Sequence, residues 1–198
     1  MSLEQKQNKL ADHGINIHQE LIDRCCENDR KAQYDIYKLY YKAMYNTALR
    51  ILNNADDAED IMQESFLDAF RKIDTYHGGA TFGSWMKRIV INKSLDELRK
   101  RKDIFSIDKE GTDIIAEEIH EDPVEVLSYK VEKIRIAIAD LPEQYRIILS
   151  LHLLEGYDHE EIAEILNITY GTSRTRYSRA RQKLLAHLKK VYINFNVN

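Results

Sequence analysis

A basic segment near the C-terminus constrains this chain more than any other feature. No acidic residue follows Glu164, and seven Lys or Arg side chains lie between Gly171 and Lys190. Small or apolar residues recur at intervals of four, three and four, which places them on one face of a helix: Ser173, Tyr177, Ala180 and Leu184. The opposite face is polar and is flanked by Arg174 and Arg176; it consists of Gly171, Thr175, Ser178, Arg179 and Gln182. The absence of acids favours a helix that contacts nucleic acid over a solvated bundle helix.

A second helix is predicted just before the basic one. Asp158 and Glu161 have the spacing of a capping box, and apolar residues follow them. Asn167 tolerates the left-handed conformation that ends a helix, and Thr169 can cap the next one. A short helix, a tight turn and a basic helix form a helix-turn-helix, whose second helix enters the major groove of DNA.

Composition bounds the fold class and the compartment. The chain has 198 residues with only two Pro and seven Gly, which predicts an all-α protein. No apolar run approaches the length of a membrane span and no signal peptide is visible, so we expect a cytoplasmic protein without membrane insertion. Cys25 and Cys26 are adjacent, which argues against a disulfide framework and fits a reducing cytosol. Because this spacing is unlike that of metal ligands, we expect no metal and no cofactor.

Charge divides the chain into parts. Between Asp103 and Glu132 there are ten acidic and two basic residues, a net charge of −8 against −4 for the whole chain, so the remainder carries +4. This stretch contains Gly111 and Pro123, which indicates a linker. We therefore expect two small helical domains, over 17–102 and 131–198, joined by an acidic linker over 103–130 and preceded by a mobile tail over 1–16. Helices are also predicted over 124–139, starting within the acidic stretch, and over 142–154, before the helix-turn-helix.

The first domain is predicted to contain helices over 18–26, 30–52, 56–73 and 82–102, with Asp29 and Thr81 as N-caps. We interpret a tyrosine-rich stripe on the second of these helices as core rather than as a base-stacking surface; it consists of Tyr37, Tyr40, Tyr41, Met44, Ala48, Leu49 and Leu52. The third helix leaves a patch of hydrogen-bond acceptors on its outer face: Asp57, Asp60, Gln63 and Glu64. An Arg of a partner could bind this patch in bidentate fashion, although most acidic helix faces are only solvated.

The last helix of the first domain has two apolar faces with a polar stripe between them. The stripe consists of Arg88, Asn92 and Arg99, side chains of the kinds that read base edges and bind phosphate. The basic run that starts at Arg99 and includes Lys100 adds an attraction for phosphate that is independent of sequence. The alternative for this run is a solvated helix end, where cations favour the helix dipole.

Three blocks of this sequence resemble a known family. The chain is similar to bacterial sigma factors of the extracytoplasmic-function (ECF) class, in the sigma-70 family. Residues 57–66 resemble the core-polymerase-binding helix of region 2, residues 81–99 resemble the segment that engages the −10 promoter element, and residues 141–181 resemble region 4, which engages the −35 element. The family usually has Val at Ser173 and Leu at Tyr177, so we expect looser packing of the basic helix. Region 3 is absent, as the class implies.

The resemblance implies a role for each group of residues. The acceptor patch, Asp57, Asp60, Gln63 and Glu64, would bind the coiled coil of the largest subunit of RNA polymerase core, and region 4 would bind the flap of the second subunit. The −10 element would be engaged by Tyr76, His77, Gly78, Gly79, Arg88, Asn92, Arg99 and Lys100, with a flipped base in the glycine-containing loop. The −35 element would be engaged by Thr172, Arg174, Thr175, Arg176, Ser178 and Arg179. Promoter DNA is therefore an expected partner, and whether an anti-sigma factor is another stays open.

Two other classes of protein are alternatives to this one. A dimeric regulator could use the same helix-turn-helix without polymerase, but it would not need all three blocks in this order. An enzyme is disfavoured because the chain has no His-Glu-x-x-His spacing, no Gly-rich phosphate loop and no nucleophile motif. We therefore expect no catalytic residues.

Overall fold

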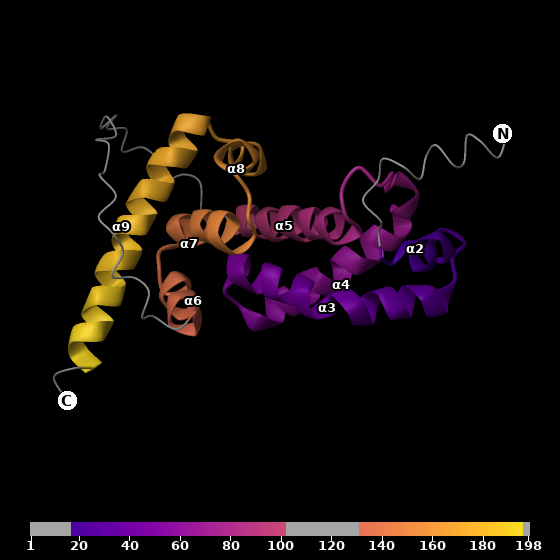
Figure 1. Cartoon of the computed structure of the whole chain (residues 1–198), viewed down its shortest axis with the longest axis horizontal. Helices are drawn as coiled ribbons and strands as arrows, with labels where there is room; N and C mark the ends of the chain where they lie inside the picture. Colours follow the sequence, from indigo (N-terminus) through magenta and orange to yellow (C-terminus); the bar gives the residue numbers. More distant parts are fainter. Residues whose placement is uncertain (1–16, 102–130, 196–198) are drawn as a thin grey trace. The chain divides into compact units, whose positions relative to one another are not determined.

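The computed structural model describes residues 17–101 and 131–195, and these parts are helical with no strand (Figure 1). The predicted all-α class is confirmed. The chain divides into two compact units, residues 1–96 and 97–198. The predicted tail and the whole of the predicted acidic linker lie outside the described residues. Among the described helices, none combines the length and apolarity that crossing a membrane requires.

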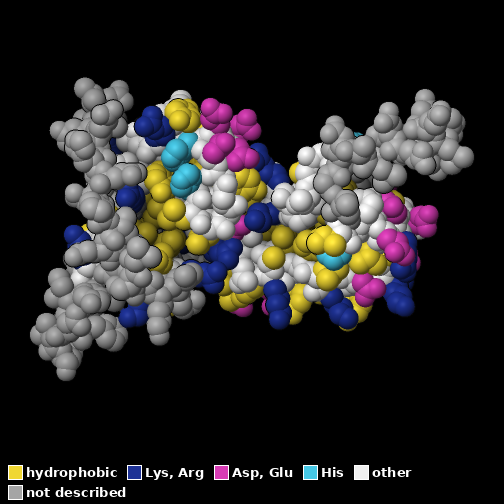
Figure 2. Space-filling view, viewed as in Figure 1, with side chains coloured by type: hydrophobic (Ala, Val, Ile, Leu, Met, Phe, Trp, Pro, Cys, Tyr) yellow, Lys and Arg dark blue, Asp and Glu magenta, His cyan; other side chains and the backbone are white. Residues whose placement is uncertain are grey.

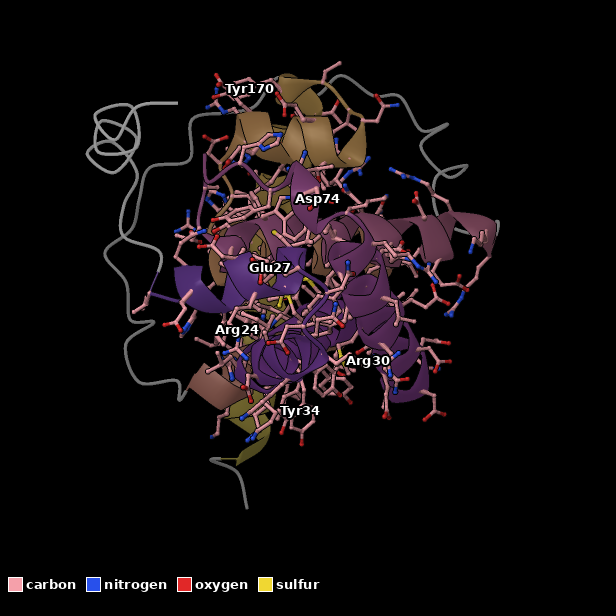
Figure 3. The ribbon with its side chains drawn as sticks, turned by 90° about the vertical axis from the view of Figure 1, so that its right-hand side faces the viewer. Arg24, Glu27, Arg30, Tyr34, Asp74 and Tyr170 are labelled. Carbon is pink, nitrogen blue, oxygen red and sulfur yellow. The ribbon has the colours of Figure 1, made fainter. Side chains whose placement is uncertain are left out.

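Within residues 17–96, the first unit contains α2 (Gln19–Cys26), α3 (Arg30–Leu52), α4 (Ala55–Arg71) and most of α5 (Phe82–Lys100). A 3₁₀ turn, Ile73–Thr75, follows α4. Asp29 caps α3 as predicted, because its carboxylate accepts hydrogen bonds from the backbone N–H of Lys31 at 2.8 Å and of Ala32 at 3.2 Å. The same carboxylate pairs with Arg24 at 2.6 Å and so ties α2 to α3; Figure 3 shows Arg24 beside this corner.

The break between α3 and α4 is made by two asparagines. Asn53 adopts the left-handed conformation, with φ 54°, and ends α3. Asn54 then accepts hydrogen bonds from the backbone N–H groups of Asp56 and Asp57 and starts α4. Because the turn is this short, α3 and α4 pack along each other as an antiparallel pair (Figure 1).

Aromatic rings fill the space between the helices of the first unit. The ring centroids of Tyr37 and Phe66 of α4 lie 4.9 Å apart, and those of Tyr40 and Phe82 of α5 lie 5.4 Å apart. Both pairs pack edge to face. The tyrosine stripe therefore packs against the core, as predicted, with the rings half-buried and Met44 and Ala48 fully buried. Both apolar faces of α5 are covered, and Val90 and Ser94, which the sequence pattern did not single out, are fully buried with them.

The second unit carries the helix-turn-helix. Its helices are α6 (Val131–Ala139), α7 (Glu143–Leu149), α8 (His159–Leu166) and α9 (Tyr170–Phe195). The predicted helix from 142 to 154 is not a uniform α-helix, because Ser150–Leu154 form a π-helical turn in which the N–H of Glu155 donates to the carbonyl of Ser150. Such turns insert an extra residue and shift the side chains that follow. This turn carries His152.

The caps of the helix-turn-helix are as predicted. Asp158 and Glu161 form a complete capping box at the start of α8. Asn167 ends α8 with φ 55°, in the left-handed conformation. Thr169 then accepts a hydrogen bond from the N–H of Thr172 at 3.1 Å and caps α9.

Candidate nucleic-acid interface

The outward face of α9 presents most of the predicted −35 residues. Arg174 and Arg179 are exposed, and Thr172, Thr175 and Ser178 are half-exposed beside them. Ser173 and Ala180 are fully buried and Leu184 nearly so, which confirms the predicted inward face. Two arginines with free surface around them, near the N-terminal end of the helix, have the chemistry needed to contact base edges in a major groove.

Arg176 is a correction to the predicted arrangement. Its side chain is only 9% exposed, so it does not flank the outward face. The reason is its spacing: Arg176 lies three residues after Ser173 and four before Ala180, both buried, and therefore shares their side of the helix. A role for Arg176 in binding phosphate loses its geometric basis, whereas Arg181 is exposed.

A cluster of four side chains joins the π turn, α8 and α9. The rings of His152 and His159 stack at 4.8 Å with an interplanar angle of 7°. Both rings meet Tyr177 edge to face, at 4.5 Å and 5.2 Å. Nδ1 of His159 lies 3.1 Å from Oγ of Ser173, and Nδ1 of His152 lies 2.8 Å from the carbonyl of Tyr157. Histidine side chains are visible on this face of the second unit in Figure 2.

This histidine cluster, defined as His152, His159, Ser173 and Tyr177, explains the two departures from the family pattern. The sequence predicted looser packing where Ser173 and Tyr177 replace aliphatic residues. In the structure the Ser173 hydroxyl is hydrogen-bonded and the Tyr177 ring is packed, so the departures are compensated. Although the two histidines stack, no metal-binding cluster of three or more His, Cys, Asp or Glu occurs among the described residues.

The environment of His159 favours its neutral form. Burial lowers the pKa of His159 below its ordinary value, and electrostatic interactions with His152 and Arg174 lower it further, while Asp158 opposes them. Burial likewise raises the pKa of the Tyr177 hydroxyl. The contact between α8 and α9 therefore favours an uncharged His159 ring and an uncharged Tyr177 hydroxyl.

The predicted −10 residues lie on α5 and on the loop before it. Asn92, Arg99 and Lys100 are exposed and Arg88 is half-exposed, so the polar stripe faces solvent as predicted. Glu97 pairs with Lys100 at 3.3 Å and with Arg101 at 3.5 Å, which reduces the positive charge of the basic run.

The loop before α5 is anchored by Tyr76. Its ring packs on Phe82 and Trp85, each at 5.5 Å, and its hydroxyl donates to the carbonyl of Ala80 at 2.7 Å. Gly78 has φ 76°, a conformation that side chains disfavour, and a Cβ at Gly79 would meet nothing within 4 Å. His77 is exposed and Gly78 half-exposed at the tip. The ends of the loop are thus packed against α5, and its tip is open to solvent.

The acceptor patch on α4 is only partly open. Asp60 and Gln63 are exposed, whereas Asp57 is half-buried. Lys93 of α5 binds Glu64 at 3.1 Å and Asp68 at 3.0 Å, and its hydrogen bond lowers the pKa of Asp68. Glu64 is thus already paired within the first unit.

An exposed leucine, Leu67, extends the face of α4 that carries the acceptor patch. Leu67 follows Asp60, Gln63 and Glu64 at helical spacing and is 57% exposed. The sequence pattern did not single it out, because a single apolar residue at the end of a polar face is common. Leu67 adds one exposed apolar side chain beside the acceptors.

Comparisons with known proteins agree with this arrangement. The model of sigma-70 region 2 matches residues 36–104, and that of sigma-70 region 4 matches residues 132–184. The ECF RNA polymerase sigma factor SigW of Bacillus subtilis is 33% identical over 177 residues, which cover 85% of this chain and 95% of SigW. The ECF RNA polymerase sigma-E factor of Haemophilus influenzae is 31% identical over 175 residues, which cover 84% of this chain and 92% of that protein.

Solved structures show the same fold. The sigma factor RpoE of Bartonella quintana, in complex with the anti-sigma factor NepR, aligns with a TM-score of 0.54 and 25% identity over 79% of this chain and 96% of that one. CnrH, in complex with the cytosolic domain of CnrY, aligns with a TM-score of 0.52 at 18% identity. The chain belongs to the ECF class of the sigma-70 family. It is a sigma factor, a protein that binds RNA polymerase core and directs it to promoters.

Proposed function

We propose a division of labour among three surfaces of this sigma factor. The outer face of α4 binds RNA polymerase core, the loop before α5 and the stripe on α5 engage the −10 element, and the outward face of α9 reads the −35 element. The observation that carries this proposal is the order of the two family regions, each with its predicted polar face exposed. We also propose that the protein acts in the cytoplasm, without catalytic activity of its own.

Recognition of the −35 element rests on Arg174 and Arg179. Both are exposed on α9, and a guanidinium can donate two hydrogen bonds to O6 and N7 of guanine. Thr172, Thr175 and Ser178 flank them and supply hydroxyls that contact bases or phosphates. Arg181 binds phosphate, a role that Arg176 cannot share, since Arg181 is exposed and Arg176 is not.

Recognition of the −10 element combines a stripe with a loop. Asn92, with Arg88 and Arg99, offers hydrogen bonds to the bases and phosphates of an opened strand. His77 and the two glycines at the open tip of the loop leave room for an extruded base, while Tyr76 holds the loop in shape. Extrusion of a base costs a few kcal/mol, so a preformed pocket is needed to stabilise the open strand.

Binding to core polymerase rests on Asp60 and Gln63, with Leu67 at the edge. The carboxylate and the amide oxygen accept hydrogen bonds from a basic partner, and Leu67 adds apolar contact area. Glu64 is paired with Lys93, so it can bind core polymerase only if it keeps Lys93 as a second partner or gives up that ion pair. One solved relative is bound to an anti-sigma factor, so we include such a factor among the proposed partners.

The function is tested by transcription reconstituted from purified core polymerase, this protein and genomic DNA fragments. A sigma factor starts transcripts at defined promoters with core alone, whereas a regulator of the helix-turn-helix type needs another sigma factor. Sequencing of the transcript starts would also identify the promoters. Transcripts that appear only after addition of a second sigma factor would overturn the proposal.

A further inference from the structure

An exposed aromatic ring stands at the start of the recognition helix. Tyr170 is the first residue of α9 and is 49% exposed. Figure 3 labels Tyr170 at the N-terminal end of α9. None of the roles assigned above uses it.

Tyr170 contacts the arginine that lies one helical turn later. The guanidinium carbon of Arg174 lies 5.9 Å from the centre of the Tyr170 ring, within the range of a cation–π interaction. Residues four apart share a face of a helix, so the ring and the guanidinium both point toward the side that would meet DNA. The arginine is therefore held by a contact within its own helix.

The other side of Tyr170 meets the preceding helix. The ring of His159 packs edge to face against it, with centroids 6.3 Å apart and planes at 85°. His159 is itself held by Ser173 and by the stacked ring of His152. Tyr170 thus links the histidine cluster to Arg174, and its orientation depends on both helices of the helix-turn-helix.

A restrained arginine discriminates bases better than a free one. A long side chain loses rotamer freedom when it binds, and prior restraint reduces that loss. A wrong base is also penalised more when the donor cannot move to avoid it. We propose that Tyr170 is a positioning residue for Arg174 in base selection at the −35 element, with His159 holding the ring. This rests on the proposed function of Arg174.

The proposal is tested with full-length protein bound to core polymerase and a pool of DNA duplexes randomised across the −35 region. Sequencing the bound fraction gives the base preference at each position. Tyr170→Leu should reduce the preference at the position that depends on Arg174 by about two- to fivefold, the factor of an exposed cation–π pair. Tyr170→Phe, which keeps the ring, should retain the preference.

A matched control exists in the same unit. Lys183 lies 5.4 Å from the centre of the Tyr145 ring, so Tyr145→Leu removes a similar contact away from the start of α9. It should leave base preferences unchanged even if it lowers stability, because a loss of folded protein weakens binding to all sequences alike.

The outcomes separate a positioning role of Tyr170 from a direct contact with DNA and from a failure of the role proposed for Arg174. If Tyr170→Leu leaves the preference unchanged, the positioning role is wrong. If its effect persists in an Arg174→Ala background, or if Tyr170→Phe is as damaging, Tyr170 contacts DNA itself and the proposal is overturned. If Arg174→Ala alone changes no base preference, it is the function proposed for Arg174 that fails.

Discussion

Among single residues, His159 stands out at the junction of α8 and α9. It is partly buried, it is hydrogen-bonded to Ser173, and its ring contacts three other rings. In most helix-turn-helix units of this family, as the resemblance implied, the facing positions on α9 are aliphatic. Here the contact between His159 and Ser173 is polar, and each group has a hydrogen-bond partner. Loss of that partner is costly, because a buried polar group cannot replace it with a hydrogen bond to water. The stability of this junction therefore depends on the protonation state of His159.

The first prediction follows from the lowered pKa of His159. The folded protein binds a proton on the His159 ring less readily than the unfolded chain does. The contribution of neutral His159 to the free energy of unfolding is therefore complete above the ordinary histidine pKa of 6.5 and is lost as pH falls below it. His159→Gln keeps a partner for Ser173 and removes the titration. The free energy of unfolding by urea, followed by circular dichroism, should depend less on pH in the variant between about pH 7.5 and 5.5.

One control separates this effect from others. The single tryptophan, Trp85, lies in the first unit, so its fluorescence reports that unit and should not show the difference. Equal pH dependence in wild type and His159→Gln would contradict the prediction.

The second prediction concerns Asp60. Reversal of its charge with Asp60→Lys should weaken binding to core polymerase by about 1.5–3 kcal/mol, the range for a hydrogen bond to a charged group. Glu20→Lys is the matched control, because Glu20 is an exposed acid of α2 and the change in net charge is the same. Affinity for core is measured by competition with a labelled sigma factor. Equal losses for the two variants would show only a nonspecific charge effect and remove Asp60 from the interface.

Among the helices, α8 is defined by its ends more than by its length. It has only eight residues, too few for a stable isolated helix, and its start carries a complete capping box. Its buried residues, Ile162, Ile165 and Leu166, then pack against α9 and the π turn. The angle at which α9 leaves the turn is set by Asn167 and Thr169, so these local signals orient the recognition helix.

The third prediction tests the cap. Asp158→Ala removes an acceptor for the N–H groups of Glu160 and Glu161, both at 2.8 Å, and should lower the free energy of unfolding by about 1 kcal/mol. Glu160→Ala, in the same turn, removes a charge but no cap and should cost only a few tenths of a kcal/mol. Urea denaturation followed by circular dichroism measures both. If the two variants lose equal stability, the cap does not hold α8.

At the scale of the whole molecule, the chain is two units in sequence. The division into units falls between Asp96 and Glu97, inside α5, a few residues before the predicted end of the first domain. The family regions end at residue 104 and resume at 132, and the acidic stretch lies between them. These limits support the linker, which stays a prediction because its residues are not among those described.

The fourth prediction tests that linker. Brief digestion with thermolysin should cut first between Asp103 and Pro123, where apolar residues such as Ile104 and Phe105 lie among the acids, and should leave two resistant fragments. Mass spectrometry of the fragments locates the first cut. A first cut inside α3 or α9, or equal resistance along the chain, would contradict the domain boundaries.

The sequence by itself determined the helices and their ends. Apolar periodicity, the caps at Asp29 and Asp158 and the breaks at Asn53 and Asn167 depend on residues within a few positions of one another, so they are legible without a fold. The order of the two regions and the exposed polar faces followed from the same local patterns. The family resemblance, confirmed by the comparisons, added the function.

Only the tertiary structure decided which polar side chains are free to act. Lys93 reaches Glu64 across 29 positions of the chain, and His152, His159 and Tyr177 come from three different elements. The π turn that places His152 has no simple sequence signal. Such contacts form when helices pack, and their partners are set by geometry between elements rather than by spacing along one.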